Sequence, residues 1–214
     1  MPGGSRRGGA RLSPPSSGTN EQRLHAAAPG VPPFRIESDG ILLRPLRASE
    51  AQVERMATWP EDEAAASMFN APQGAWPVEK VRDYVSRFDQ RTGFLIGIFQ
   101  RADGQADTLV GICLIRVNWQ HRTGLLEVLI GDRAWRGRHL LRIIGDDLIG
   151  FLLNTWHLEK LTAHVRPANK SMKWVLLRGG WKREAYLHSH IATPDGRSDI
   201  ELYGLLPGDW RRPD

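Results

Sequence analysis

Cysteine is nearly absent from this sequence, in which Cys113 is the one thiol among 214 residues. A single cysteine cannot form an intrachain disulfide, so a fold held together by disulfides is excluded. Cys113 stands in an apolar stretch that is typical of a buried strand, where a lone thiol is usually an inert packing residue rather than a nucleophile. Such a chain suits a reducing compartment, and we expect it in the cytoplasm.

Long apolar runs are also missing from the sequence. No stretch approaches the roughly 20 apolar residues that a membrane-spanning helix needs, so no membrane partner is expected. The first 22 residues are rich in glycine, serine and arginine. They lack the apolar core of a secretory signal peptide, so we do not expect secretion.

The excess of positive charge is small in the part of the chain that follows residue 33. The formal net charge is +5, and residues 1–33 contribute +3 of it, which leaves +2 for the rest. Nucleic-acid binding by that remainder is therefore not favoured. Residues 1–33 are rich in Gly, Pro, Ser, Ala and Arg and poor in bulky apolar residues, which predicts a disordered basic tail. Residues 34–214 are long enough for one domain with a sizeable core.

The apolar patterning of residues 34–214 changes repeatedly between strand and helix periods. Asp39-Gly40 is a strong turn dipeptide that predicts a short hairpin. Strands 125–130 and 161–165 are joined by a helical crossover and are therefore expected to be parallel. The other predicted strands span 34–36, 41–46, 94–99, 109–115, 184–193 and 199–205, and helices are predicted to begin at Ser49 as N-cap, at Val78, at Leu140 and after Asn169, with a loop or broken helix over 60–77. This order predicts an α+β domain on a mixed sheet.

A short basic turn between strand 125–130 and the helix that begins at Leu140 is the clearest candidate for a ligand site. The turn contains Arg133, Arg136, Arg138 and His139. The open N–H groups and the positive dipole end of the helix point toward this turn, and together they form a ready site for phosphate. The alternative is that the turn is only a solvated basic loop.

Four groups of residues follow one another in an order and spacing typical of a known family. They are Ile41–Leu46; Ile130-Gly131-Asp132 with Trp135-Arg136-Gly137; Asn169 with Val175-Leu176 and Gly180-Trp181; and Asp195-Gly196 with Asp199 and Tyr203–Leu206. The chain thereby resembles the GNAT family of acyl-CoA-dependent N-acetyltransferases. It is most similar to the branch that acetylates ribosomal-protein N-termini and small amines. The resemblance covers about residues 34–206.

The resemblance implies acetyl-CoA, or another acyl-CoA, as co-substrate, and no metal. It implies a mixed, mainly antiparallel sheet with helices on both faces and a parallel pair splayed at its centre, where the pantetheine arm lies like an added strand. Main-chain groups would hold this arm, and the amides and arginines of the basic turn would meet the diphosphate. The residues assigned to the cofactor in this way are Val128, Leu129, Ile130, Arg133, Arg136, Gly137, Arg138, His139, Leu140, Leu141 and Asn169.

The implied reaction is a direct transfer in a ternary complex, in which a neutral primary amine attacks the thioester. Glu127 is the candidate base, because it is the only carboxylate within the apolar run beside the expected acetyl group. Alternatively, Glu127 lies on the outer face of the strand and pairs with Arg116 or Arg122. Asn169 would contact the cofactor arm or serve as a helix N-cap. His164 is more typical of a satisfied core histidine than of a base.

Departures from the family pattern keep a second function open. His139 and Leu141 stand where the family loop has a second glycine and a small residue, so their side chains would crowd the diphosphate. Leu176 stands where many members have a tyrosine that acts as the acid. The alternative is a GNAT-like domain with a degenerate CoA loop that acts as a non-catalytic binding or regulatory protein. The acceptor is expected to be a small-molecule amine or a protein N-terminus, and the oligomeric state stays open between monomer and homodimer.

Overall fold

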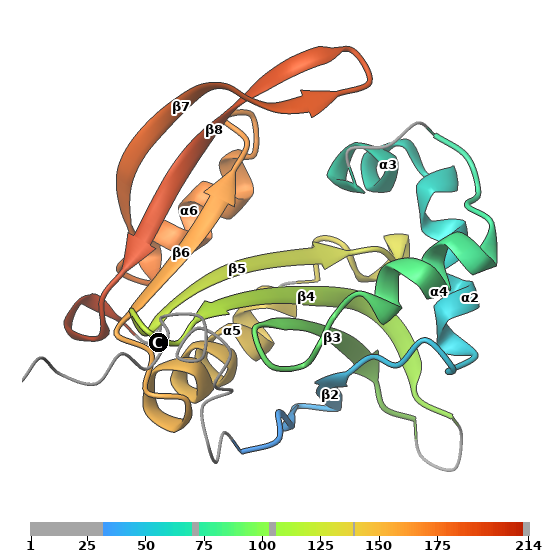
Figure 1. The fold of residues 1–214 in the computed structure, drawn as a ribbon, viewed down its shortest axis with the longest axis horizontal. Coiled ribbons are helices and arrows are strands. Elements are labelled where there is room, and N and C mark those ends of the chain that lie inside the picture. Colours follow the sequence, from blue (N-terminus) through green and yellow to red (C-terminus); the bar gives the residue numbers. More distant parts are fainter. Residues whose placement is uncertain (1–31, 70–72, 103–105, 139, 212–214) are drawn as a thin grey trace, which may run out of the picture.

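The computed structural model describes residues 32–69, 73–102, 106–138 and 140–211 (Figure 1). The expected tail, apart from its last two residues, lies outside these ranges, as do the turn at residues 103–105 and His139. Within the described ranges, no helix has both the length and the apolar character that crossing a membrane would require.

Eight strands form one sheet in the order β1-β2-β3-β4-β5-β6-β8-β7. The strands are β1 (Ile36–Ser38), β2 (Ile41–Pro45), β3 (Gly93–Gln100), β4 (Thr108–Asn118), β5 (Thr123–Ile130), β6 (Lys160–Val165), β7 (Lys182–Thr193) and β8 (Gly196–Leu205). The helices are α2 (Gln52–Thr58), α3 (Glu63–Phe69), α4 (Val78–Ser86), α5 (Leu140–Gly150), which continues as a π-helical turn (Phe151–Thr155), and α6 (Lys170–Arg178). All neighbouring strands are antiparallel except β5 and β6. The expected α+β class and mixed, mainly antiparallel sheet are confirmed.

Helices cover both faces of this sheet, and each face has its own hydrophobic core. Helix α5 packs on one face, where Cys113 of β4 is buried. Helices α2 and α4 pack on the other face, where the neighbouring Ile112 is buried. This division follows from the two-residue period of a strand, which sends successive side chains to opposite faces. Burial also raises the pKa of the Cys113 thiol, which agrees with a packing role.

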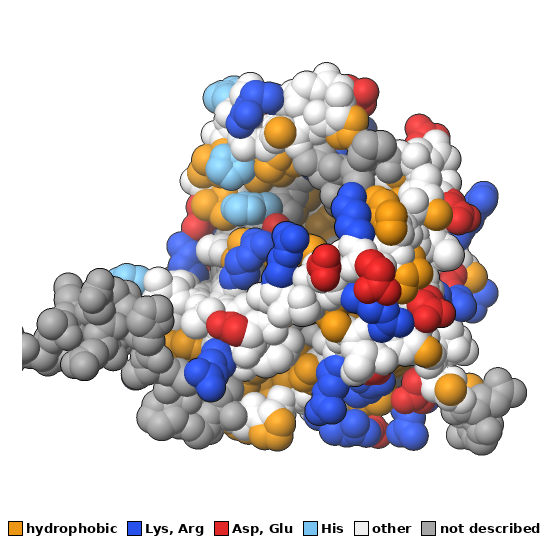
Figure 2. Space-filling view, turned by 45° about the vertical axis from the view of Figure 1, so that its right-hand side comes forward, with side chains coloured by type: hydrophobic (Ala, Val, Ile, Leu, Met, Phe, Trp, Pro, Cys, Tyr) orange, Lys and Arg blue, Asp and Glu red, His pale blue; other side chains and the backbone are white. Residues whose placement is uncertain are grey.

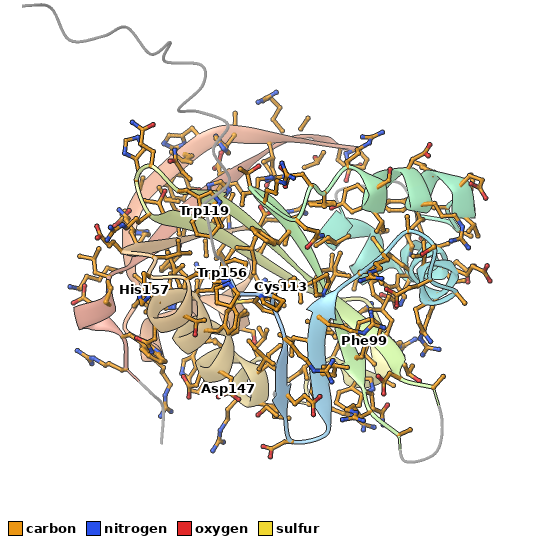
Figure 3. The ribbon with its side chains drawn as sticks, turned by 60° about the horizontal axis from the view of Figure 1, so that its bottom comes forward. Phe99, Cys113, Trp119, Asp147, Trp156 and His157 are labelled. Carbon is orange, nitrogen blue, oxygen red and sulfur yellow. The ribbon has the colours of Figure 1, made fainter. Side chains whose placement is uncertain are left out.

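An aromatic cluster lies at the end of the face that α5 covers. Its members are Phe34, Phe94, Trp119, Phe151 and Trp156. Figure 3 shows Trp119 and Trp156 close together near α5. Each indole N–H donates to a main-chain oxygen, Trp119 to Arg91 at 2.6 Å and Trp156 to Pro32 at 3.3 Å. The cluster therefore attaches the beginning of the described chain to the end of the central helix.

Two local predictions need correction. The first strand spans 36–38 rather than 34–36, because Phe34 packs in the aromatic cluster; the turn at Asp39-Gly40 is confirmed by the positive φ of both residues, 43° and 76°. Ser49 is not an N-cap, since α2 begins at Gln52 without a capping side chain. The carboxylate of Glu50 instead accepts a hydrogen bond from the Arg47 amide at 2.9 Å, so the acidic neighbour serves the turn before the helix.

Gly131, at the end of β5, has no room for a side chain. A Cβ there would lie 1.9 Å from Cδ2 of the buried Trp59 indole. Overpacking of this kind costs about 1–3 kcal/mol, so we expect Gly131→Ala to lower the free energy of unfolding by that amount in denaturant titrations. Gly145→Ala is the matched control, because a Cβ at this site on α5 meets no atom within 4 Å. It should raise the free energy of unfolding by about 0.5–1 kcal/mol through helix propensity. Equal effects of the two substitutions would contradict the packing of Trp59 on Gly131.

Candidate active site

Strands β5 and β6 separate soon after they pair. Their parallel pairing joins only Thr123–Leu125 to Lys160–Thr162. Beyond it, β5 remains paired with β4 as far as Ile130, and β6 remains paired with β8 as far as Val165. Figure 1 shows the two halves of the sheet diverging from this point. The expected splay is confirmed, and we call the two unpaired strand edges, residues 126–130 and 163–165, the slot.

The main chain of β5 presents hydrogen-bonding groups to the slot. The hydroxyl of Thr162 on β6 donates to the Gly124 carbonyl at 3.4 Å, so that carbonyl faces β6. Main-chain groups of successive residues in a strand face opposite sides within the sheet. The groups of Val128 therefore face the slot as well. The carbonyl of Leu129 faces β4 instead, where a Cβ on Gly111 would lie 2.7 Å from its oxygen.

Arg136 fixes the loop that follows β5. Its guanidinium donates to the carbonyls of Ile130 at 3.1 Å and Gly131 at 2.8 Å, and it pairs with the Asp62 carboxylate. The side chain is 19% exposed. Asp132 supports the same loop, because its carboxylate accepts from the Ala134 amide at 2.9 Å. The guanidinium of Arg136 thus holds the loop in shape, and its main-chain amide donates to the Arg133 carbonyl at 3.2 Å within the same turn.

Two other arginines of the basic turn, Arg133 and Arg138, are exposed to solvent, and the Arg138 guanidinium lies 5.6 Å from the centre of the Trp135 ring. Gly137 has a φ of 75°, a left-handed conformation that favours glycine. Leu140 is buried and Leu141 is half-buried, and both pack on the core that α5 covers. His139 was also assigned to the cofactor, but it lies outside the described residues.

Helix α3 contacts the chain on both sides of the slot. Asp62, just before α3, pairs with Arg136 in the loop after β5. Ser67 on α3 accepts a hydrogen bond at 3.1 Å from Arg166, which directly follows β6. Hydrogen bonding from Arg136, followed by that from the Ala65 amide, holds the pKa of Asp62 below its usual value. These contacts place α3 across the open end of the slot.

Glu127 lies beside the slot and also on the face opposite α5, so the two sequence-based interpretations are compatible. Its carboxylate is 40% exposed and lies 3.9 Å from the Arg116 guanidinium. Arg122, the other expected partner, pairs with Glu159 at 2.7 Å instead. The second close neighbour of Glu127 is His164 of β6, with Nδ1 4.0 Å from Oε1. In Figure 2, pale-blue histidine and blue Lys and Arg side chains border a hollowed area of the surface.

Sequence reasoning missed the proximity of His164 to Glu127. A usable signal was present, since the two residues stand at matching positions of strands that were expected to be parallel. The imidazole of His190 on β7 also lies close, with its ring centre 5.7 Å from that of His164. This contact could not be found from sequence, because the long β7–β8 hairpin determines which residue of β7 reaches β6.

Asn169 and Leu176 have local packing roles on α6. The Asn169 side-chain oxygen accepts from the Met172 amide at 3.0 Å, which is the N-cap interaction that was one of its two expected roles. Leu176, at the position of the family tyrosine, is 7% exposed and belongs to the core that α5 covers.

The segment that contains the slot, the basic turn and α5 lies within the match of a family model. The model of the acetyltransferase (GNAT) domain matches residues 41–182, which is more than half of the chain. The chain belongs to the GNAT acetyltransferase family. Among curated protein sequences, none matches this acetyltransferase significantly.

Solved structures show the same fold at low sequence identity. A GNAT-family acetyltransferase from Bacillus anthracis matches with a TM-score of 0.66 and 15% identity, covering 81% of this chain and 98% of that one. Spermidine N-acetyltransferase from Vibrio cholerae, in complex with CoA and spermine, matches with a TM-score of 0.67 and 13% identity, covering 79% of this chain and 97% of that one. Ribosomal-protein-S5-alanine acetyltransferase from Vibrio fischeri matches with a TM-score of 0.62 and 14% identity, covering 83% of this chain and 99% of that one. At these identities the likeness concerns the fold.

Removing the Asn169 side chain tests its cap role separately from any contact with a ligand. Asn169→Ala should lower the free energy of unfolding by about 1 kcal/mol, because the Met172 amide loses its acceptor. Asn169→Asp should keep the free energy near the wild-type value, since the carboxylate accepts the same hydrogen bond. Both are measured by denaturant titration without ligand. A loss of stability in the aspartate variant as large as that in the alanine variant would show that the cap does not account for the effect.

Proposed function

We propose that this acetyltransferase moves an acetyl or other acyl group from acetyl-CoA to a primary amine, by direct attack in a ternary complex. The observation that carries the proposal is the slot. An unpaired strand edge in the middle of a sheet leaves main-chain groups that can pair with an extended ligand, and here the edge leads directly to a basic loop and the first turn of α5. An extended arm that ends in phosphates supplies both sets of partners.

The residues around the slot fit acetyl-CoA. Main-chain groups of β5, Val128 above all, would pair with the pantetheine arm as an added strand does. The amides from Gly137 to Leu141 would hold the diphosphate, with help from the exposed Arg133 and Arg138. The Arg136 amide donates to the Arg133 carbonyl instead. Gly137 supports this fit, because an added Cβ would meet no atom within 4 Å and the space beside the loop is open. Asn169 is the remaining cofactor contact of the proposal, made through the amide group that its cap interaction leaves available.

Glu127 is the group that we assign to proton removal from the amine, directly or through water. Acetyl-CoA supplies an activated acyl group as a thioester, so the protein has to position the amine, remove its proton and stabilise the developing oxyanion. Glu127 is half-exposed on the face that α5 does not cover, so an amine can approach it without displacing the central helix. The carboxylate also attracts an ammonium group by charge.

The acceptor class of the proposal is a small-molecule amine or a protein N-terminus. Two of the proteins with this fold are named as acting on spermidine and on ribosomal protein S5. Both kinds of acceptor present a primary amine that is an ammonium ion in neutral solution. A panel that holds polyamines and peptides with free N-termini therefore covers the proposal.

Binding of acetyl-CoA should stabilise the folded protein. A ligand at 100 times its dissociation constant adds about 2.7 kcal/mol of apparent stability, and a thermal-shift titration would measure it. Arg138→Gln should reduce the shift and its salt dependence, because an exposed cation beside the phosphates is lost. Arg87→Gln, an exposed arginine at the end of α4, is the control and should leave the shift unchanged. The absence of a thermal shift at millimolar acetyl-CoA would contradict the proposed acyl transfer and favour the non-catalytic alternative.

Loss of the Glu127 carboxylate should slow acyl transfer. We expect Glu127→Gln to lower kcat by about 10²-fold or more, the contribution of a general base, with the dissociation constant of acetyl-CoA unchanged. Thiol release with the amine panel gives kcat, and calorimetry gives the binding constant. Glu159→Gln removes another exposed carboxylate of an ion pair and is the matched control. An active Glu127→Gln protein would remove Glu127 from the chemistry while leaving the transferase intact.

A further inference from the structure

Glu127 and His164 stand at matching positions on the two sides of the slot. Leu125 and Thr162 form the last register pair of β5 and β6. Glu127 and His164 each follow two residues later, which is one repeat of a strand. Both side chains therefore leave the sheet on the same face, the one opposite α5, and they come within 4.0 Å although their strands have parted. A group that enters the slot from this face meets both side chains.

The proposed reaction must dispose of one proton in each turnover. When an ammonium acceptor becomes an amide, one N–C bond forms and one C–S bond breaks. The nitrogen loses two protons; one of them ends on the departing sulfur, and the other has to leave the site. A neutral imidazole accepts a proton on its free ring nitrogen, and a nearby carboxylate favours the imidazolium that results. The imidazole beside Glu127 can therefore take over the proton that the carboxylate removes from the amine.

We propose that His164 acts with Glu127 as a proton-accepting pair, in which the imidazole holds the proton and the Glu127 carboxylate stabilises the resulting imidazolium. This inference rests on the proposed function, and it adds a second residue to the chemistry. A separation of 4.0 Å between Nδ1 and Oε1 is too long for a hydrogen bond but short enough for a strong charge interaction once the imidazole is protonated. The His164 side chain is 27% exposed, so the proton can pass to solvent.

The charged groups that face His164 come from three other strands. Burial lowers the pKa of His164, Glu127 of β5 raises it, and His190 of β7 and Arg116 of β4 lower it. Tyr84 of α4 faces Arg116 and Glu127 from the helix above, and burial raises its own pKa, so it stays neutral here. The imidazole is therefore neutral in neutral solution and can accept a proton. Glu127 opposes the burial effect, which is what a stabiliser of the imidazolium must do.

The first test compares an NMR titration with kinetics, both on the full chain. The acid limb of kcat/KM reports the ionisation of an essential group in the free enzyme. We expect its inflection to fall at the pH at which the His164 imidazole titrates. Glu127→Gln should move the NMR titration of His164 to lower pH, because the favourable carboxylate is lost. Arg116→Gln should move it to higher pH. These NMR shifts require neither turnover nor acetyl-CoA.

The second test removes the imidazole. His164→Asn should lower kcat by about 10²-fold and abolish the acid inflection, while KM for acetyl-CoA stays within about twofold, because the proposed cofactor contacts are untouched. His157→Asn is the matched control. His157, labelled in Figure 3, is exposed and has a φ of 53°, which asparagine tolerates. Its kcat and pH profile should equal those of the wild type.

The outcomes separate this inference from the proposed function. A wild-type enzyme that binds acetyl-CoA and releases thiol, together with a His164→Asn variant that keeps its kcat and acid inflection, overturns the role of His164 alone. An NMR titration of His164 that is unaffected by Glu127→Gln overturns the pair. A wild type that neither binds acetyl-CoA nor releases thiol overturns the proposed function and this inference with it.

Discussion

The short pairing between β5 and β6 is the constraint on which the rest of the structure depends. Only three residues on each strand pair, and after them each strand follows a different antiparallel neighbour. Antiparallel neighbours hold both strands firmly, so the sheet divides along the line where the pairing is weakest. The division opens main-chain groups in the middle of a large sheet, a place where they are normally satisfied. Everything that we assign to substrate binding follows from this one interruption.

Charged side chains connect the segments on the two sides of the slot at its open end. Arg136 joins the carbonyls at the end of β5 to Asp62, and Arg166 joins the start of the next loop to Ser67. Ion pairs with such partial exposure contribute little to stability, so their effect is geometric. They fix the loop beside the first turn of α5 and set α3 across the opening. The network explains why the guanidinium of Arg136 is engaged within the protein although it lies in the basic turn.

The sequence was sufficient for the architecture, because apolar periodicity and turn residues act locally. The helical crossover between strands 125–130 and 161–165 predicted their parallel arrangement, and the positive φ at Asp39-Gly40 was predictable from residue type. The sequence did not predict how α2 begins or which groups Arg136 contacts, because several partners compete in each case. Ser49 does not cap α2, and no other side chain does so, because the helix begins only at Gln52. Before it, the Glu50 carboxylate accepts hydrogen bonds from the Arg44 guanidinium and the Arg47 amide. The engagement of Arg136 by two carbonyls likewise requires the loop geometry, which no pattern of residues specifies.

The candidate chemistry divides between the two faces of the sheet, and this division explains why Glu127 could be interpreted in two ways. A residue of β5 faces either α5 or the opposite face, and a carboxylate facing α5 would be buried in an apolar core at a cost of several kcal/mol. Glu127 therefore has to face outward, where Arg116 is available as a partner. In the proposed reaction the acceptor reaches the slot from this same face. The ion pair of Glu127 with Arg116 and the proposed access of the amine to Glu127 thus both follow from strand alternation. The amine can approach Glu127 while the ion pair stays in place, because a carboxylate has two oxygens that accept hydrogen bonds.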